Sequence, residues 1–388
     1  MPTSANRNAK VAARLALMIC LLLVATPAAG CQAPLKGDVT VYVAAPLSGW
    51  QAEGGQTVAG GVHLMAKQIN DSGGLLGYRV KVVDLDDEAS TDVAASIAQQ
   101  VADGVSRERV IGLIGHYNSD QTAAGMEVYQ GLPIVVVTPT ATDVSLTTRG
   151  YGNFFRVNAT DAAQAPADAE FLVQDLGLKR IAVVYADNGY GRGLRKQMHQ
   201  ALQALGVEPA AEIEIREAAP TQEEAVSRLL ALNPEAVFLA GYETEGYVLL
   251  PELREAGYQG VFVAADGCFL YEFIDGSGPA AEGAYVSGVT PDSAAVADAR
   301  WWKAYQDVEK RNPGTYSVAG YVAMQVLAKG VERARSFDAA KVAAAIHELD
   351  MSSLIGPIRY DTKGDLQQQS IYVFQVQNGQ FVQVKPKP

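Results

Sequence analysis

The feature that most constrains the fold is an alternation of short apolar runs with segments of helical period. The run at 38–45 has the length and composition of a buried β-strand. In the next segment, Val58, Val62, Met65 and Ile69 recur at the spacing of one helix face. The alternation continues through apolar runs at 79–87, 109–115 and 133–139 and helical segments at 94–104 and from 120 onward. A β-α-β-α succession predicts a parallel sheet with helices on both faces.

A second alternation begins near Asp161 and predicts a second α/β lobe. It comprises strands at 180–187, 211–215, 236–241 and 260–266 and helices at 165–176, 193–205, 221–232 and 246–256. The remaining chain predicts helices over 298–311, 316–335 and 338–349 and short strands near Ile358 and at 371–376. Two domains are also what a chain of 388 residues would be expected to form.

The first thirty residues are set apart from the fold by their composition. Arg7, Lys10 and Arg14 precede an apolar run at 15–25 that is too short to span a bilayer and has the size of a signal-peptide core. Small residues then lead directly to Cys31, a pattern that resembles the lipobox of bacterial lipoproteins.

This pattern predicts a lipoprotein signal peptide over 1–30, lipidation of Cys31, and a tether over 31–37 that anchors the exported chain to the cell membrane. Two alternatives stay open. Ordinary secretion would leave Cys31 as a free thiol, and an uncleaved leader would itself act as the anchor; both still export the chain.

Composition excludes several classes of protein. The chain has 31 basic and 43 acidic residues, and removal of residues 1–30 leaves 28 basic residues and a net charge of −15, which argues against a nucleic-acid binder. The three cysteines and four histidines show no spacing typical of a disulfide framework or metal site. We therefore expect no metal, no cofactor and no nucleic-acid partner, and we expect Cys268 to be a buried apolar residue.

No motif of a common catalytic site occurs in the chain. There is no G-x-S-x-G elbow, H-E-x-x-H helix, Walker loop or C-x-x-C pair. The segment 189–194 lacks the third glycine of a dinucleotide loop and is interpreted as a tight turn that opens a helix. His116 has no evident nucleophile or orienting partner and is interpreted as a loop or rim residue. The sequence therefore favours a protein that is not an enzyme.

A series of short motifs keeps a fixed order from about residue 38 to residue 376. It comprises Pro46-Leu47-Ser48-Gly49, Ile69-Asn70, Asp86-Asp87, Ile114-Gly115, Ser119, the run 138–142, Phe155-Arg156, Asp161, the run 190–194, Gly241-Tyr242, Asp266-Gly267, Ala281-Glu282-Gly283, Tyr321 and Gly356-Pro357. Together these motifs resemble the branched-chain amino-acid substrate-binding proteins of ABC transporters. The resemblance implies a type I periplasmic-binding fold, in which two doubly wound parallel-sheet lobes are joined by three hinge crossings and enclose a ligand.

Mapped onto this chain, the resemblance implies that lobe 1 comprises 38–157 plus 289–368 and that lobe 2 comprises 158–288 plus 369–384, with a tail at 385–388. The three hinges would lie near 157–160, 286–290 and 366–370.

The same resemblance implies a pocket that binds the two charged ends of an amino acid. Ser119 stands where an N-cap residue would open a helix from Asp120, and such a helix end suits a carboxylate. Thr140, Ala141 and Thr142 would complete that cradle. Asp266 would receive the ammonium group; from the residues alone, Asp266 before Gly267 also fits a simple turn.

Aromatic residues would form the walls of this pocket. The resemblance places Tyr190, Tyr242 and Tyr316 there, although an ordinary core or surface position stays open for each of them, and most of all for Tyr316. Trp50 falls in the loop that is expected to face the side chain of the ligand, and Tyr117, next to the serine region, is expected to be a further ligand-binding residue.

Three residues depart from the pattern of the relatives. Gly54 stands where some relatives carry a bulky aromatic residue, and Tyr117 and Asn118 differ from what the best-known members carry beside the serine. The shape of the pocket and the identity of the ligand are therefore left open.

The resulting expectation is a monomeric, lipid-anchored protein that faces the periplasm or the cell exterior. It would capture a small amino acid, branched-chain or otherwise small and apolar, and deliver it to the permease subunits of an ABC importer. The alternative is a sensory or regulatory receptor of the same fold for an amide, urea or an aromatic acid. An enzyme would be the third class.

Overall fold

The computed structural model describes residues 34–386, which form two open α/β sheets. The first sheet has the order β2-β1-β3-β4-β5, and all its neighbouring strands are parallel. Its strands are β1 (Asp38–Ala45), β2 (Arg79–Asp86), β3 (Val110–Gly115), β4 (Val135–Thr138) and β5 (Phe154–Arg156). Because β1 is apolar along almost its whole length, it is covered on both faces, as a central parallel strand requires.

The second sheet has the order β14-β13-β10-β9-β8-β6-β7. Its strands are β6 (Ile181–Ala186), β7 (Ala211–Ile215), β8 (Ala236–Ala240), β9 (Val261–Ala264), β10 (Tyr285–Gly288), β13 (Tyr372–Gln377) and β14 (Gln380–Lys385). The strands from β6 to β10 are parallel, whereas β13 and β14 join the edge as antiparallel strands. A separate short hairpin pairs β11 (Met351–Ser353) with β12 (Gly356–Ile358). The predicted fold class is therefore confirmed.

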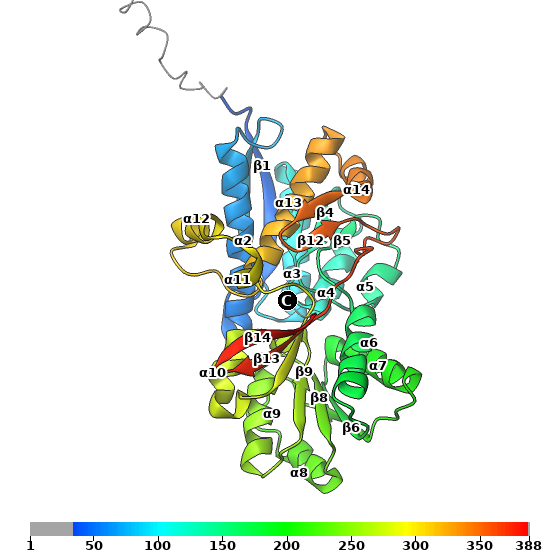
Figure 1. The fold of residues 1–388 in the computed structure, drawn as a ribbon. Coiled ribbons are helices and arrows are strands. Elements are labelled where there is room, and N and C mark those ends of the chain that lie inside the picture. The colour runs from blue at the N-terminus through cyan, green and yellow to red at the C-terminus, as the bar shows by residue number, and fades with distance from the viewer. Residues whose placement is uncertain (1–33, 387–388) are drawn as a thin grey trace, which may run out of the picture.

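Helices cover both faces of each sheet, and the two layered lobes lie one above the other (Figure 1). The helices around the first sheet are α2 (Ala52–Asp71), α3 (Thr91–Arg107), α4 (Ser119–Tyr129), α5 (Ser145–Thr148), α11 (Ser293–Val296), α12 (Ala299–Glu309), α13 (Ser317–Ala334) and α14 (Ala339–His347). Those around the second sheet are α6 (Asp161–Glu170), α7 (Gly189–Ala204), α8 (Glu223–Leu232), α9 (Glu243–Glu255) and α10 (Tyr271–Ser277).

Two glycines let α2 and α13 pack with their backbones in contact. A Cβ atom at Gly61 would lie 1.9 Å from the carbonyl oxygen of Ser317, and one at Gly320 would lie 2.1 Å from that of Val58. No side chain fits at either position. This contact joins the late helix α13 to the early helix α2, so lobe 1 is built from distant parts of the chain.

Three chain crossings connect the lobes, and hydrogen bonds join them side by side. The backbone N–H of Ala159 in the first crossing donates to the carbonyl of Val289 in the second, at 3.2 Å. The N–H and hydroxyl of Thr160 both donate to the side-chain oxygen of Gln369 in the third, at 2.8 and 2.9 Å. The three crossings therefore lie next to one another.

Several elements differ from the sequence prediction. Helix α7 begins at Gly189, so the segment 189–194 is the first part of a helix and not a separate tight turn. Strand β14 was not predicted; it extends through Lys385, whose ammonium group pairs with Asp175, so the predicted tail over 385–388 is wrong at its first residue.

The predicted signal peptide, Cys31 and the start of the tether lie outside the described residues. Within 34–386, no helix combines the length and apolarity that a membrane span needs.

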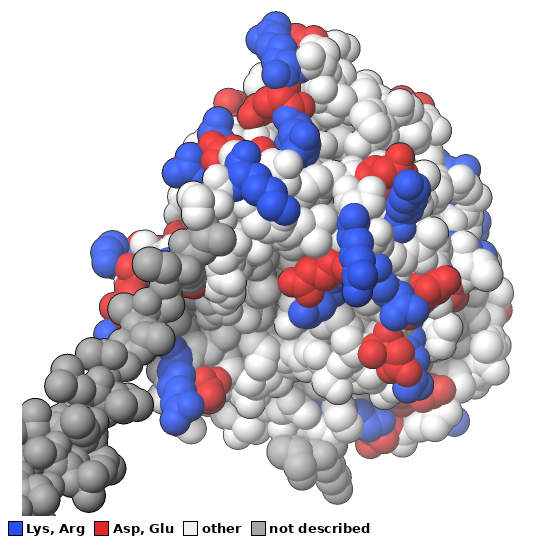
Figure 2. Space-filling view, turned by 90° about the horizontal axis from the view of Figure 1, so that it is seen from above, with Lys and Arg blue, Asp and Glu red and all other residues white. Residues whose placement is uncertain are grey.

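Charged side chains of both signs are mixed on the surface. Figure 2 shows Lys and Arg interspersed with Asp and Glu on the face seen from above. The net negative charge is therefore not gathered into one acidic patch on this face.

Candidate functional site

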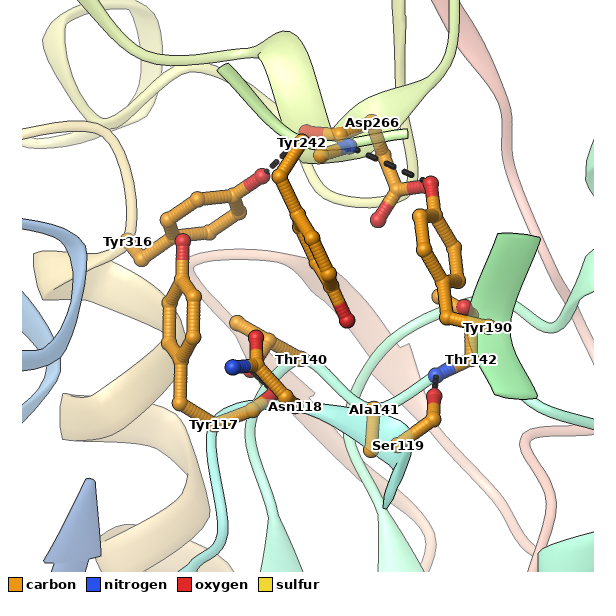
Figure 3. A pocket seen from close by; sticks show the side chains of 11 residues that line it. Tyr117, Asn118, Ser119, Thr140, Ala141, Thr142, Tyr190, Tyr242, Asp266 and Tyr316 are labelled. Atoms are coloured by element: carbon orange, nitrogen blue, oxygen red, sulfur yellow. Dashed lines mark hydrogen bonds between the residues drawn. The ribbon is translucent and has the colours of Figure 1, made fainter. Parts of the chain in front are cut away.

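A small cavity lies where the carboxyl ends of strands from both sheets face one another. Its empty volume is about 270 Å³, so it suits a small molecule. It is lined by Tyr117, Asn118, Ser119, Thr140, Ala141, Thr142, Tyr190, Tyr242, Asp266, Gly267 and Tyr316 (Figure 3). The structure thus brings together all the predicted site residues except Trp50.

The lobe 1 wall is the N-terminus of α4. Ser119 is the first residue of this helix, and its hydroxyl oxygen accepts the backbone N–H groups of Thr142 and Asp143, both at 3.2 Å. Since a hydroxyl has one hydrogen to donate, that hydrogen stays available to a ligand. No side chain caps the helix, so its first N–H groups and its dipole favour a negatively charged group here.

Hydrogen bonds from behind the cavity hold the loop after β4. The Thr140 hydroxyl donates to the carbonyl of Tyr117 at 2.5 Å. The buried guanidinium of Arg156 donates to the carbonyl of Ala141 at 2.8 Å and pairs with the carboxylate of Asp365 at 2.6 Å. Thr140 and Ala141 are therefore fixed in position before any ligand binds.

His116 lies in the loop between β3 and α4, as predicted, but it is buried and not at the rim. Its side chain is fully buried, with Nδ1 2.7 Å from the carboxylate of Asp87 and Nε2 3.0 Å from the Tyr129 hydroxyl. Its carbonyl accepts the Thr138 hydroxyl at 2.9 Å. His116 therefore anchors the segment that leads from β3 to Ser119.

The lobe 2 wall centres on Asp266, whose carboxylate is buried and hydrogen-bonded. The Tyr190 hydroxyl donates to Oδ1 at 2.7 Å, and the Tyr316 hydroxyl donates to the Asp266 backbone carbonyl at 2.7 Å. Burial raises the pKa of Asp266 to about 6, while the hydrogen bonds from Tyr190 and Gln164 act in the opposite direction. The carboxyl is therefore mostly ionised at neutral pH, and an arriving cation would relieve the cost of its burial.

Aromatic rings close the remaining sides of the cavity. Tyr190 and Tyr242 stack with their ring centroids 4.9 Å apart, and Tyr117 meets Tyr316 edge to face at 5.5 Å. Trp50 does not line the cavity; its ring packs edge-on against Tyr242 at 6.0 Å, beside the aromatic cluster of lobe 2. Its role is to support the Tyr242 wall.

Three residues near the site were missed as site residues by the sequence prediction. Asn118 and Gly267 line the cavity, and a Cβ atom at Gly267 would lie 2.4 Å from the carbonyl of Gly241. Asp161 is buried next to this region: burial raises its pKa, a Coulombic contribution from Asp266 raises it further, and the Thr142 hydroxyl lowers it. The available signal was their position directly after predicted strands or within the motif series.

A contact between the lobes lies beside the cavity. The carboxylate of Asp120, on α4 of lobe 1, accepts the backbone N–H groups of Gly189 at 2.9 Å and Tyr190 at 3.4 Å, at the N-terminus of α7 in lobe 2. A negative charge is favourable at a helix N-terminus. Asp120 therefore links the two lobes in the arrangement described here.

The variant Asp120→Ala is expected to shift the ligand-free protein toward an open arrangement, because it removes both bonds. Small-angle X-ray scattering should record a larger radius of gyration for the variant. Asp187→Ala is the matched control, since Asp187 accepts the N–H of Glu217 within lobe 2 only. An unchanged radius in Asp120→Ala would show that this contact does not hold the lobes closed.

Comparison with known proteins agrees with this architecture. A family model described as periplasmic binding protein matches residues 38–380. The chain is 30% identical over 356 residues to Leu/Ile/Val-binding protein homolog 3 of Brucella melitensis, an alignment that covers 89% of this chain and 93% of that protein.

Solved structures of periplasmic binding proteins share this fold. A leucine-binding protein from Thermotoga maritima superposes with a TM-score of 0.81 at 26% identity and covers 89% of this chain and 97% of its own. A solute-binding protein of an ABC transporter from R. palustris, in complex with benzoate, shares the fold with a TM-score of 0.79 at 20% identity over 90% of this chain and 96% of its own. The chain therefore belongs to the periplasmic binding protein family, whose members bind a substrate without catalysing a reaction on it.

Proposed function

We propose that this protein captures an amino acid between its two lobes and delivers it to an ABC importer. The observation that supports this most is the chemistry at the two ends of one small cavity. One end is the α4 N-terminus with the Ser119 hydroxyl, which suits a carboxylate, and the other is the buried carboxylate of Asp266, which suits an ammonium group.

The contacts at the two ends of the cavity can supply much of the free energy that micromolar binding needs. A hydrogen bond to a charged group contributes about 1.5–3 kcal/mol, so two such ends supply roughly 3–6 kcal/mol. Micromolar binding needs about 8 kcal/mol. Burial of the ligand between Tyr190, Tyr242 and Tyr316 and closure of the lobes would supply the remainder.

Export and anchoring form the second part of the proposal. The chain would be exported by the leader at 1–30 and held at the membrane through a lipid on Cys31, as a monomer that meets the permease subunits there. Membrane fractionation of the wild type and of Cys31→Ser tests this part: loss of membrane association in Cys31→Ser supports it, and unchanged association contradicts it.

Binding of an aromatic acid is the second candidate, because the R. palustris relative was solved with benzoate. Asp266 argues against it, since benzoate has no cation to pair with a buried carboxylate. Isothermal titration of ligand-stripped protein with a panel of amino acids and benzoate tests the choice. We expect heat from at least one amino acid and none from benzoate; the reverse result would favour the second candidate.

Amino-acid binding should also weaken in acid. The ammonium group needs ionised Asp266, and the pKa of this carboxyl is about 6. Because Asp266 is protonated below that value and must then lose its proton on binding, the affinity at pH 5 should be about tenfold lower than at pH 7. Titrations across this range measure the effect, and Asp266→Asn should abolish this contribution. An affinity that does not change with pH would argue against an ammonium contact with Asp266.

A further inference from the structure

One end of the cavity presents an unpaired hydrogen-bond acceptor. Asn118 lines the cavity and is only 5% exposed. Its side-chain oxygen is buried and has no hydrogen-bond partner within 34–386. Asn118 is also the N-cap residue of α4, where asparagine usually caps the helix, yet its side chain makes no capping bond. In Figure 3 it stands beside Tyr117, across the cavity from Tyr190 and Thr142.

A chain of buried polar groups explains why the oxygen of Asn118, rather than its nitrogen, is unpaired. The Asn118 amide nitrogen donates to the side-chain oxygen of Gln51 at 2.5 Å. Burial raises the pKa of Glu243 well above its usual value, and the nearby Gln51 amide acts in the opposite direction, although the Gln51 nitrogen has no hydrogen-bond partner among the described residues. Because the Gln51 oxygen only accepts, it pairs with the Asn118 nitrogen, and the Asn118 oxygen is left without a partner among the described residues.

The surroundings leave this acceptor to the ligand. The described residues that line the cavity include no Lys, Arg or His. The Tyr117 ring occupies the space beside Gly54, where a Cβ atom would lie 2.5 Å from the Tyr117 hydroxyl, so the cavity stays small at this end. Asn118 adjoins Ser119 in the chain, but in Figure 3 its amide lies on the Tyr117 side of the cavity, apart from the Ser119 hydroxyl and the Asp266 carboxylate, so the side chain of the ligand is the group expected to reach it.

We propose that the cavity selects an amino acid whose neutral side chain donates a hydrogen bond, a carboxamide or a hydroxyl, and that Asn118 accepts this bond. This inference rests on the proposed function. An aliphatic side chain would leave the buried oxygen unpaired, and an acidic side chain would place another acceptor against it. A cationic side chain would lose its hydration to a neutral oxygen in a cavity of about 270 Å³ without a counter-charge at the point of contact.

Amino acids of nearly equal size can test whether the cavity prefers a donor, an apolar or an acceptor side chain. Isothermal titration of the stripped protein with asparagine, leucine and aspartate compares a donor, an apolar group and an acceptor; threonine and valine form a second pair. Because an unpaired buried acceptor is costly, we expect asparagine to bind about tenfold or more tightly than leucine and aspartate, or threonine to do so relative to valine.

Asn118→Leu, which changes the amide to an apolar group of similar size, should reverse this order and favour leucine or valine. Gln51→Leu is the second variant: it frees the Asn118 amide to rotate and should reduce the preference for a donor without enlarging the cavity. Asn312→Leu, at an exposed position, is the control and should leave the preference unchanged.

The outcomes separate this inference from the proposed function. Leucine bound as tightly as asparagine together with valine bound as tightly as threonine would overturn the role of Asn118 while leaving amino-acid binding intact. Aspartate bound more tightly than asparagine, or an unchanged preference in both Asn118→Leu and Gln51→Leu, would do the same. Absence of binding by every amino acid would overturn both.

Discussion

Replacing Asp266 with Asn is expected to weaken amino-acid binding about 100-fold or more, because removing one partner of a buried charge pair leaves the other charge unpaired. Asp266 is only 6% exposed, and the Tyr190 hydroxyl already occupies one position on its carboxylate. The ammonium group of the ligand would lose its water on entering the cavity and would meet a neutral amide instead of a carboxylate. Isothermal titration measures the loss.

The fold should tolerate Asp266→Asn. The pKa of Asp266 is about 6 in the folded protein, above the ordinary value of 3.8, so its ionised form is disfavoured by folding. The free-energy cost of burying the ionised carboxyl is absent at low pH, where Asp266 is protonated, and is fully present above pH 6. A neutral amide removes this cost, and its oxygen can still accept the hydrogen bond from Tyr190, so the free energy of unfolding at pH 7 should stay the same or increase.

Two comparisons identify the cause of the lost affinity. A 2-hydroxy analogue of the amino acid carries no ammonium group, so Asp266→Asn should weaken it far less than the amino acid; equal losses would refute the assigned contact. Asp168→Asn is the matched control, because Asp168 is also a buried carboxyl of lobe 2 but bonds to Ser287 outside the cavity. The Asp168→Asn variant should bind the amino acid with an affinity close to that of the wild type.

Replacing Arg156 with Met is expected to lower the free energy of unfolding by about 3–5 kcal/mol, the usual cost of leaving one charge of a buried pair without its partner. Arg156 is fully buried and pairs with Asp365 at 2.6 Å. It also donates to the carbonyls of Ala141 and Asp143 and to the Thr147 hydroxyl. Methionine can fill much of the volume but replaces none of these bonds. Denaturant unfolding measures the change.

A matched surface pair provides the control for Arg156→Met. Arg359 pairs with Asp350 on the exposed surface, so Arg359→Met should cost about 1 kcal/mol or less. Arg156→Met should also weaken ligand binding, because the loop that carries Thr140 and Thr142 loses its support. A stability loss no larger than that of the surface variant would mean that Arg156 does not brace this loop.

Most of the fold could be predicted from local patterns. The apolar run at 38–45 is β1 with the same bounds, and the helix inferred from Val58 to Ile69 is α2. Helix or strand period depends on residues that are close in the sequence, and the resulting faces must be buried wherever the element packs. The residues at the ends of predicted strands, such as Ser119 and Asp266, could be assigned for the same reason, because carboxyl ends of parallel strands meet at one edge.

Predictions failed where the local signal was weak or the partner was distant. The glycines at 189, 191 and 193 indicated a turn, yet Asn188 caps a helix by accepting the N–H of Gly191, and that cap sets the start of α7. His116 was interpreted as a loop or rim residue without a partner, because its partners, Asp87 and Tyr129, are contributed by other parts of the chain. No pattern around a single residue reports such contacts.

The sequence by itself therefore determined the two-lobed architecture, the family and most of the residues that line the cavity, because periodicity and motif order are properties of neighbouring residues. Only the tertiary structure decided how the buried polar groups are used. It placed Trp50 behind Tyr242, joined Asp120 to the start of α7, and left the oxygen of Asn118 unpaired beside Tyr117. The direction of a buried hydrogen bond depends on which distant segment supplies its partner, and that is settled only when the lobes are packed together.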